Sequence, residues 1–239
     1  SYFDCHGEQS DEFDSRLAAF LVWHRAKALP QYAPLAEEAA ARIQRGVKRG
    51  DLEWGYDAVQ AQIRQALRAA AAESAGLLDR LSADQIAHFE QRLADENRKF
   101  VKEQVQGTVE ERQQRRVKRN VERLEDWFGS LSDAQVERVR RYGARAPFSD
   151  ALRDADRRRR QAELLAMLRA REAKQRLAQW AEAWDRGRDP AYAEASRATA
   201  AEYFDLLLDL DRTLSAQQRE HVAQRLKRYA GLFESLARQ

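Results

Sequence analysis

Apolar side chains recur every three or four positions along most of the chain, which is the spacing of amphipathic α-helices. The first stripe consists of Phe13, Leu17, Phe20, Leu21 and His24. It predicts a helix from about Glu8 to Ala28, and Leu29-Pro30 should stop it, because proline disfavours helical backbone in the preceding residue. A second helix is expected from Pro34 to about Arg49, and a third from Asp51 towards Leu81.

The segment from Ser149 to Asp185 could form one very long helix. Its apolar stripe changes side along the way, since Leu164, Leu165 and Leu168 are followed by apolar residues on roughly the opposite face. Those later residues are Leu177, Trp180 and Trp184. Such a helix would either bend or pack against different partners at its two ends.

Four short sequences have the pattern of a capping box, in which a Ser or Thr N-cap and a Gln or Glu three residues later bond each other's backbone N–H groups. The boxes begin at Ser82, Thr108, Ser132 and Ser215. Leu81 and Ile86 would add a hydrophobic staple around the first box. The boxes are unevenly spaced, so they predict separate helix starts and not a repeat of fixed period.

Composition agrees with helix nearly everywhere. The 239 residues include 10 Gly and 4 Pro, and the hydrophobic fraction of 44% is sufficient for a packed core. The charged fraction of 34% indicates slender helices with much solvated surface. The predicted fold is all-α, an elongated bundle of about eight or nine helices with no sheet. Residues 1–239 are treated as one helical domain, with possible halves at 1–143 and 148–239 and a hinge near 144–147.

Charge and targeting signals narrow the class of protein. The 42 basic and 39 acidic side chains leave a net charge of +3, which does not favour a nucleic-acid binder. No apolar stretch approaches the roughly 20 residues that span a bilayer, and no signal peptide is present. The abrupt start is compatible with removal of an upstream targeting segment. Cys5 is the single cysteine, and we interpret it as a buried or half-exposed small residue.

The sequence lacks the common motifs of catalysis and cofactor binding. It has no glycine-rich phosphate loop, no paired-cysteine metal pattern and no nucleophile elbow. The histidines His6, His24, His88 and His221 are too scattered for a metal site on one helix face. We therefore expect no catalytic residue, no metal, no cofactor and no enzymatic activity.

Two polar residues lie on apolar stripes. His24, between Trp23 and Arg25, is interpreted as a core-edge histidine bonded to a neighbouring helix, or alternatively as part of a ligand pocket near the Leu29-Pro30 corner. Asn97 is interpreted as an interhelical polar clasp, because a buried amide needs hydrogen-bond partners. A binding role is the alternative for Asn97.

Two basic runs, Arg112 to Arg123 and Arg157 to Arg160, are the third polar feature. Such runs are usually solvated faces paired with acidic neighbours, here Glu110, Glu111, Glu122 and Asp154. The alternative is an anion-binding strip for lipid headgroups or an acidic protein. Aromatic residues are not interleaved with these arginines, which further disfavours binding to nucleic acid.

Several segments carry a resemblance to a known family. They are Ser1-Tyr2-Phe3-Asp4 with Gln9, Trp23-His24-Arg25 with Leu29-Pro30-Gln31-Tyr32, Glu96-Asn97-Arg98-Lys99-Phe100, Leu124-Glu125-Asp126-Trp127-Phe128-Gly129 with Leu131 to Gln135, Arg159-Arg160-Gln161, and Leu214 to Tyr229. Over nearly its whole length the chain resembles an uncharacterised helical lipoprotein family of Gram-negative bacteria, classified as a domain of unknown function. The resemblance implies a signal peptide and a lipidated cysteine upstream, and hence a lipid-anchored, periplasm-facing position in the cell envelope. It supplies no catalytic residue.

A looser similarity exists to the periplasmic helical foldases that assist secreted lipases, which share arginine-rich long helices and repeated Leu-Ser starts. The chain lacks their diagnostic stretch, so this similarity is an analogy.

The leading hypothesis is a non-enzymatic, envelope-anchored protein that binds or scaffolds an envelope protein partner. The alternatives are a module that binds a lipid or amphiphile in an apolar cleft, and a chaperone-like periplasmic protein. We expect no nucleic-acid partner, and membrane contact only through the upstream anchor. An enzyme centred on His24 ranks last. The candidate binding residues are Trp23, His24, Arg25, Asn97, Arg98, Trp127, Arg160 and Gln161.

Overall fold

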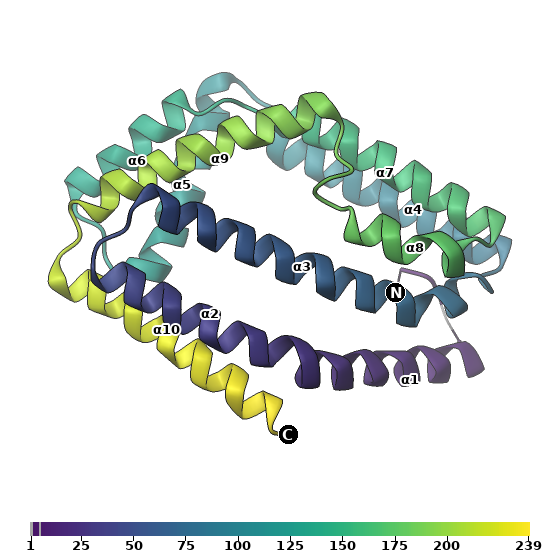
Figure 1. Ribbon diagram of the computed structural model, residues 1–239. Helices are drawn as coiled ribbons and strands as arrows, with labels where there is room; N and C mark the ends of the chain where they lie inside the picture. The colour runs from purple at the N-terminus through teal and green to yellow at the C-terminus, as the bar shows by residue number, and fades with distance from the viewer. Residues whose placement is uncertain (1, 5) are drawn as a thin grey trace. The chain divides into compact units, whose positions relative to one another are not determined.

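The computed structural model describes residues 2–4 and 6–239. The chain is 84% helical and the described residues contain no strand, which confirms the all-α prediction (Figure 1). The interpretation of Cys5 concerns a residue outside the described part. The α-helices are α1 (Glu8–Trp23), α2 (Leu29–Gln44), α3 (Arg49–Leu78), α4 (Ala83–Phe100), α5 (Val109–Phe128), α6 (Asp133–Arg145), α7 (Asp150–Ala170), α8 (Ala173–Glu182), α9 (Pro190–Asp211) and α10 (Ala216–Ala237), and the π-helical segments are η1 (His24–Ala28) and η2 (Val101–Val105).

Contacts divide the chain into two compact units. Unit 1 comprises residues 1–28, 60–105 and 150–193, and unit 2 comprises residues 29–59, 106–149 and 194–239. Each unit therefore gathers three separate stretches of the chain. The proposed hinge near 144–147 stays a prediction.

The first helix does not stop at Leu29-Pro30, so that predicted boundary is wrong. α1 passes into η1, and α2 begins at Leu29 instead of Pro34. A π-helix bonds residues five apart and shifts the hydrogen-bond register. Pro30 consequently falls in the first turn of α2, where a missing N–H is tolerated best. α2 also ends earlier than predicted, because Gly46 adopts a positive φ of 91° soon after Gln44.

All four predicted capping boxes are present. At Ser82, Thr108, Ser132 and Ser215 the hydroxyl accepts from the N–H three residues on, and that residue's side chain accepts from the cap N–H. Each cap is expected to stabilise its helix by about 1 kcal/mol. Leu81 and Ile86 are buried in one apolar cluster, as a hydrophobic staple requires.

The segment from 149 to 185 is not one helix. α7 ends at Ala170 and α8 begins at Ala173, and Arg171 between them has a positive φ of 57°. The N–H of Glu172 donates to Met167 O at 3.1 Å, and the N–H of Arg171 donates to Leu168 O at 3.1 Å. These two bonds form a Schellman C-cap, so the change of side in the apolar stripe marks a helix break.

A residue distant in sequence starts α8. The carboxylate of Asp79 accepts from the backbone N–H of Ala173 at 2.6 Å and from that of Lys174 at 3.1 Å. These N–H groups lie in the first turn and have no partner inside the helix. Asp79 therefore ties the start of α8 to the end of α3 within unit 1.

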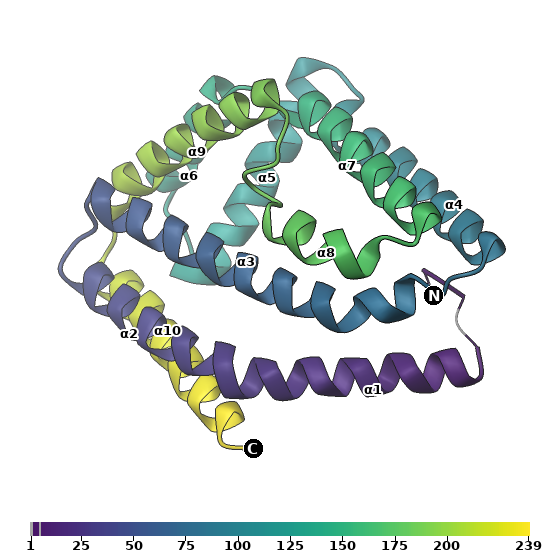
Figure 2. The ribbon, with the colours of Figure 1, turned by 45° about the vertical axis from the view of Figure 1, so that its right-hand side comes forward.

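The core of unit 1 lies where α4 and α7 run side by side (Figure 2). Its buried residues come from α3, α4, α7 and α8, with Leu81 from the turn before α4. Phe3 packs on Phe89 with ring centroids 4.5 Å apart, which attaches the N-terminal segment to α4. By contrast, α1 buries none of its residues, and Phe13, Leu17 and Leu21 of its apolar stripe are exposed.

Unit 2 combines the pair α2 and α10 with α5, α6 and α9. Small side chains permit close approach of α2 and α10, with Ala33 and Ala36 facing Ala230. A second cluster holds Leu124 of α5 and Val139 of α6 against Leu206 and Leu210 of α9. Its other buried members are Tyr142 and Ala146.

Two capping boxes of unit 2 bind each other. Gln135 and Gln218 exchange hydrogen bonds of 3.0 Å in both directions while each also caps its own helix. Their remaining N–H groups donate to Thr213 O at 3.1 Å and to Ser130 O at 2.8 Å. Gln135 is 2% exposed, so this satisfied pair is part of the core and fixes α6 to α10.

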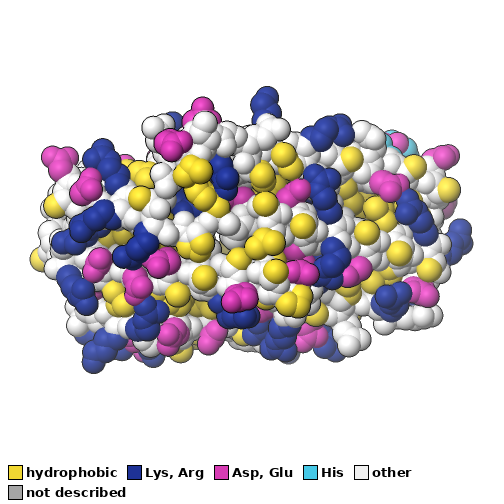
Figure 3. Space-filling view, turned by 90° about the horizontal axis from the view of Figure 1, so that it is seen from above, with side chains coloured by type: hydrophobic (Ala, Val, Ile, Leu, Met, Phe, Trp, Pro, Cys, Tyr) yellow, Lys and Arg dark blue, Asp and Glu magenta, His cyan; other side chains and the backbone are white. Residues whose placement is uncertain are grey.

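The face drawn in Figure 3 carries both signs of charge in close alternation, with apolar side chains visible between them. Within the described residues, no helix is both long enough and apolar enough to cross a bilayer.

Candidate functional site

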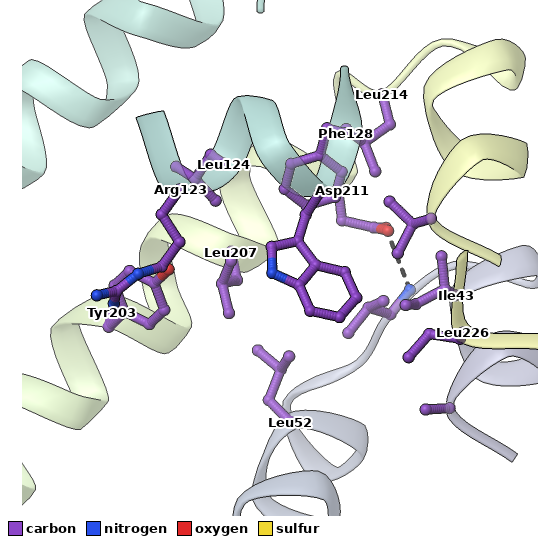
Figure 4. A pocket seen from close by; sticks show the side chains of 14 residues that line it. Ile43, Leu52, Arg123, Leu124, Phe128, Tyr203, Leu207, Asp211, Leu214 and Leu226 are labelled. Carbon is purple, nitrogen blue, oxygen red and sulfur yellow. Dashed lines mark hydrogen bonds between the residues drawn. The ribbon is translucent and has the colours of Figure 1, made fainter. Parts of the chain in front are cut away.

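An apolar cavity in unit 2 has a volume of about 330 Å³ and lies among α2, α3, α5, α9 and α10 (Figure 4). Most of its lining side chains are half-buried, so it is open to solvent. Apart from Arg123, Asp211 and the polar tips of Trp127 and Tyr203, the wall is hydrocarbon. Its other residues are Ala39, Ile43, Val47, Leu52, Leu124, Phe128, Leu207, Leu214, Val222 and Leu226.

Local sequence explains how α5 contributes to this cavity. Its apolar stripe faces the core of unit 2, and Leu124 and Phe128 at the end of that stripe extend to the cavity wall. α2 presents Ala39 at the wall, where a longer side chain would occupy the space. Leu207 of α9 and Leu226 of α10 complete opposite parts of the lining (Figure 4).

The acidic residue at the cavity is already neutralised. Asp211 Oδ1 accepts from Arg219 at 2.6 Å, and Asp211 Oδ2 accepts from the N–H of Val47 at 3.2 Å. Arg219 also donates to Ile43 O at 2.7 Å. Asp211 therefore holds the loop between α2 and α3 against the end of α9, and its role is structural.

The basic residue at the cavity, Arg123, is not neutralised in this way. Arg123 is exposed, and it lies beside Tyr203 at one side of the cavity (Figure 4). Burial raises the pKa of Tyr203, and the charge and hydrogen bond of Arg123 oppose that rise. Among the described residues no carboxylate forms an ion pair with Arg123, so its positive charge is available at the cavity.

Trp127 is the one predicted candidate that lines this cavity. The guanidinium carbon of Arg225 lies 4.9 Å from the centroid of the Trp127 ring. The ring centroids of Trp127 and Tyr229 are 6.2 Å apart. The indole is thus held by α10 while part of it faces the cavity. The other predicted candidates belong to unit 1.

Asn97 and Gln161 meet between α4 and α7, and Arg160 contacts Trp180 of α8. Asn97 donates to Gln161 at 2.7 Å and Gln161 donates back at 3.2 Å, which confirms the interhelical clasp. Arg160 stacks on Trp180 at 4.3 Å and donates to Trp180 O at 2.9 Å. Burial lowers the pKa of Arg160, whereas its neighbour Arg159 is paired with Asp156. Arg159 and Arg160 therefore contact other parts of unit 1, whereas exposed Arg158 pairs with Asp154 at 2.8 Å, as the sequence suggested for this run.

Trp23, His24 and Arg25 lie where α1 becomes η1. Trp23 and His24 are half-buried, with ring centroids 6.4 Å apart, and Arg25 is exposed. The helix that was expected to stop beside them is followed directly by η1 and then by α2 from Leu29. Arg98 is exposed and forms an ion pair with Asp95 one turn earlier.

Four arginines of the basic run lie on one face of α5. Arg112, Arg116, Arg119 and Arg123 recur at intervals of four, three and four and so share that face. Within the described chain, no carboxylate forms an ion pair with Arg112, Arg119 or Arg123. The fold also brings an aromatic ring to the run, although none is interleaved in sequence. Phe148 lies 3.8 Å from the guanidinium carbon of Arg112 and 4.1 Å from that of Arg116.

Residues 1–184 match the model of a family described as a family of unknown function, DUF6279. The chain belongs to this family. The family match stops before α9 and α10, which supply part of the cavity wall, and before the Leu214 to Tyr229 segment. No curated protein and no solved structure matched the chain. In the described part, no group of three or more His, Cys, Asp or Glu side chains has the geometry to hold a metal ion.

Proposed function

We propose that unit 2 binds an amphiphile by taking its apolar chain into the cavity. The observation that carries the proposal is the open hydrocarbon wall shared by α2, α3, α5, α9 and α10. A volume of about 330 Å³ is at the small end of the roughly 300–1,000 Å³ typical of ligand pockets. It suits one alkyl chain.

The driving force would be burial of methylene groups. Each buried CH₂ contributes about 0.8 kcal/mol, which is about fourfold in the dissociation constant. Calorimetric titration of the chain with hexanol, octanol and decanol should therefore show about a fifteenfold gain for each two added carbons until the cavity is full. Affinity that does not depend on chain length would contradict the proposal.

Two matched variants distinguish binding in the cavity from binding elsewhere on the surface. Ala39→Phe places a ring in the cavity wall, and Ala41→Phe places the same ring on an exposed position of the same helix. Ala39→Phe should abolish alcohol binding, while Ala41→Phe should bind as the parent does. Thermal melts of both variants establish that each is folded. Equal binding by both folded variants would sink the assignment of the site.

A protein partner is a second candidate, supported by the exposed stripe of α1. Phe13, Leu17 and Leu21 are each more than 40% exposed, and no residue of α1 is buried. The first half of α1 is acidic and the segment beyond Trp23 is basic. An antiparallel second copy of α1 would match these charges and cover the apolar stripe, so the occupant that we propose is a second copy of this chain.

Light scattering after gel filtration tests this second candidate. The parent chain should form a dimer at micromolar concentration, and Leu17→Glu should be monomeric with an unchanged melt. Exposed Leu232 on α10 offers the matched control, Leu232→Glu, which should remain dimeric. A monomeric parent would remove the case for self-association.

We also propose the cell envelope as the place of action, with lipid anchoring through a cysteine upstream. The support is the resemblance carried by Trp23-His24-Arg25 and the other matching segments. Fractionation of cells that make the full-length natural protein should find it with the membranes. Recovery in the cytosol would contradict this location.

A further inference from the structure

We infer that the amphiphile is anionic and that Arg123 and Arg119 of α5 bind its headgroup. This inference rests on the proposed apolar cavity and adds the charge of the ligand. Arg123 lines the cavity and Arg119 precedes it by one helical turn on the same face. Both arginines are exposed, so a headgroup can reach them from solvent.

Neighbouring charges support an anion at this position. Asp211, the acidic residue of the wall, is bound by Arg219 at 2.6 Å. On α5 itself, Glu122 is 3.9 Å from Lys118 and forms its ion pair there. Glu125 and Asp126 follow Arg123 on α5, but neither lines the cavity. Of the two charged residues that line the cavity, Arg123 is therefore the one without a partner carboxylate in the described chain.

The geometry of the guanidinium group indicates the class of headgroup. Arginine presents several N–H donors in one plane and binds the two oxygens of a carboxylate or phosphate together. Arg123 uses part of this donor capacity in its hydrogen bond to Tyr203. Residues four apart on a helix are neighbours, so Arg119 can supply further donors to the same oxyanion. The shared chemistry is an alkyl chain that ends in an oxyanion.

The experiment compares ligands of one chain length and different charge. Decanoate, decyl phosphate, decanol and decyltrimethylammonium are titrated into the full chain below their micelle concentrations, in low salt. Both anions should bind at least about tenfold more tightly than decanol, as expected for charge-assisted hydrogen bonds, and the cation should bind more weakly than decanol. The ratio of decanoate to decyl phosphate distinguishes a carboxylate from a phosphate headgroup. Raising the salt concentration should reduce the preference for anions.

Variants assign the preference to its residues. On the Arg123→Gln variant decanoate should bind no more tightly than decanol does on the same variant. Arg119→Gln should reduce the preference for decanoate in part, and Arg123→Lys should retain part of it. Exposed Arg141 on α6 provides the control, because Arg141→Gln removes the same charge away from the cavity. If decanol binds as well as decanoate, the headgroup inference is wrong and the cavity assignment stands. If no ligand of the series binds, both are wrong.

Discussion

Removing Asn97 or Gln161 from the clasp between α4 and α7 should lower the free energy of unfolding by different amounts. Asn97 is 5% exposed, whereas Gln161 is half-buried. Asn97→Ala removes two neutral hydrogen bonds of 2.7 and 3.2 Å, but leaves Gln161 able to turn towards water. Gln161→Ala leaves the buried amide of Asn97 without those partners. We expect losses of about 1–2 kcal/mol for Asn97→Ala and about 2–3 kcal/mol for Gln161→Ala.

The double variant measures how far the two residues act together. Asn97→Ala/Gln161→Ala should lose less than the sum of the single losses, with a coupling free energy of about 1–2 kcal/mol. Urea unfolding followed by far-ultraviolet circular dichroism gives all three values. Gln91→Ala, which removes an exposed bond of 3.2 Å to Asp95 on the same helix, is the control and should change stability by less than about 0.5 kcal/mol.

Two outcomes would refute this reasoning. Additive losses, within about 0.3 kcal/mol, would mean that the two amides do not depend on each other. A smaller loss for Gln161→Ala than for Asn97→Ala would mean that burial of Asn97 does not set the penalty. Either result would mean that the hydrogen bonds between the two amides do not determine what each residue contributes to stability.

Two further predictions concern the start of α8. Arg171→Gly should raise stability by up to about 1 kcal/mol in urea melts, because glycine adopts the positive φ of 57° without steric cost, whereas Arg171→Ala should give no gain. Asp79→Ala should lower stability by about 1–2 kcal/mol through loss of the bonds to Ala173 and Lys174, and unchanged melting would show that these N–H groups have other partners.

Local signals predicted the helices well wherever backbone and side chain act within one turn. The capping boxes at Ser82 and Ser132 were readable because all their atoms lie within four residues. The break at Arg171 was not, since its C′ position holds Arg in place of the usual Gly and its following helix is capped by distant Asp79. Pro30 led to a wrong prediction of a helix end, because η1 shifts the hydrogen-bond register just before it and the chain stays helical.

The cavity was less predictable than the helices. The sequence did indicate two of its residues: Trp127 lies in a segment that carries the family resemblance, and Arg123 lies in a basic run. Leu52, Leu207 and Leu226 looked like ordinary core positions, because each lies on the apolar stripe of its helix. Which apolar stripes close completely and which leave a space depends on how five helices pack, and no local pattern contains that information.

The paired capping boxes restrict which amino acids can replace their glutamines. At an isolated helix start, Glu caps as well as Gln, and the box at Thr108 does use Glu111. At Gln135 and Gln218 the amide N–H groups are also required, because each donates to the other residue's oxygen. A Glu at either position would set oxygen against oxygen. In related sequences, change at one of these positions should therefore be accompanied by change at the other, although 83 residues separate them along the chain.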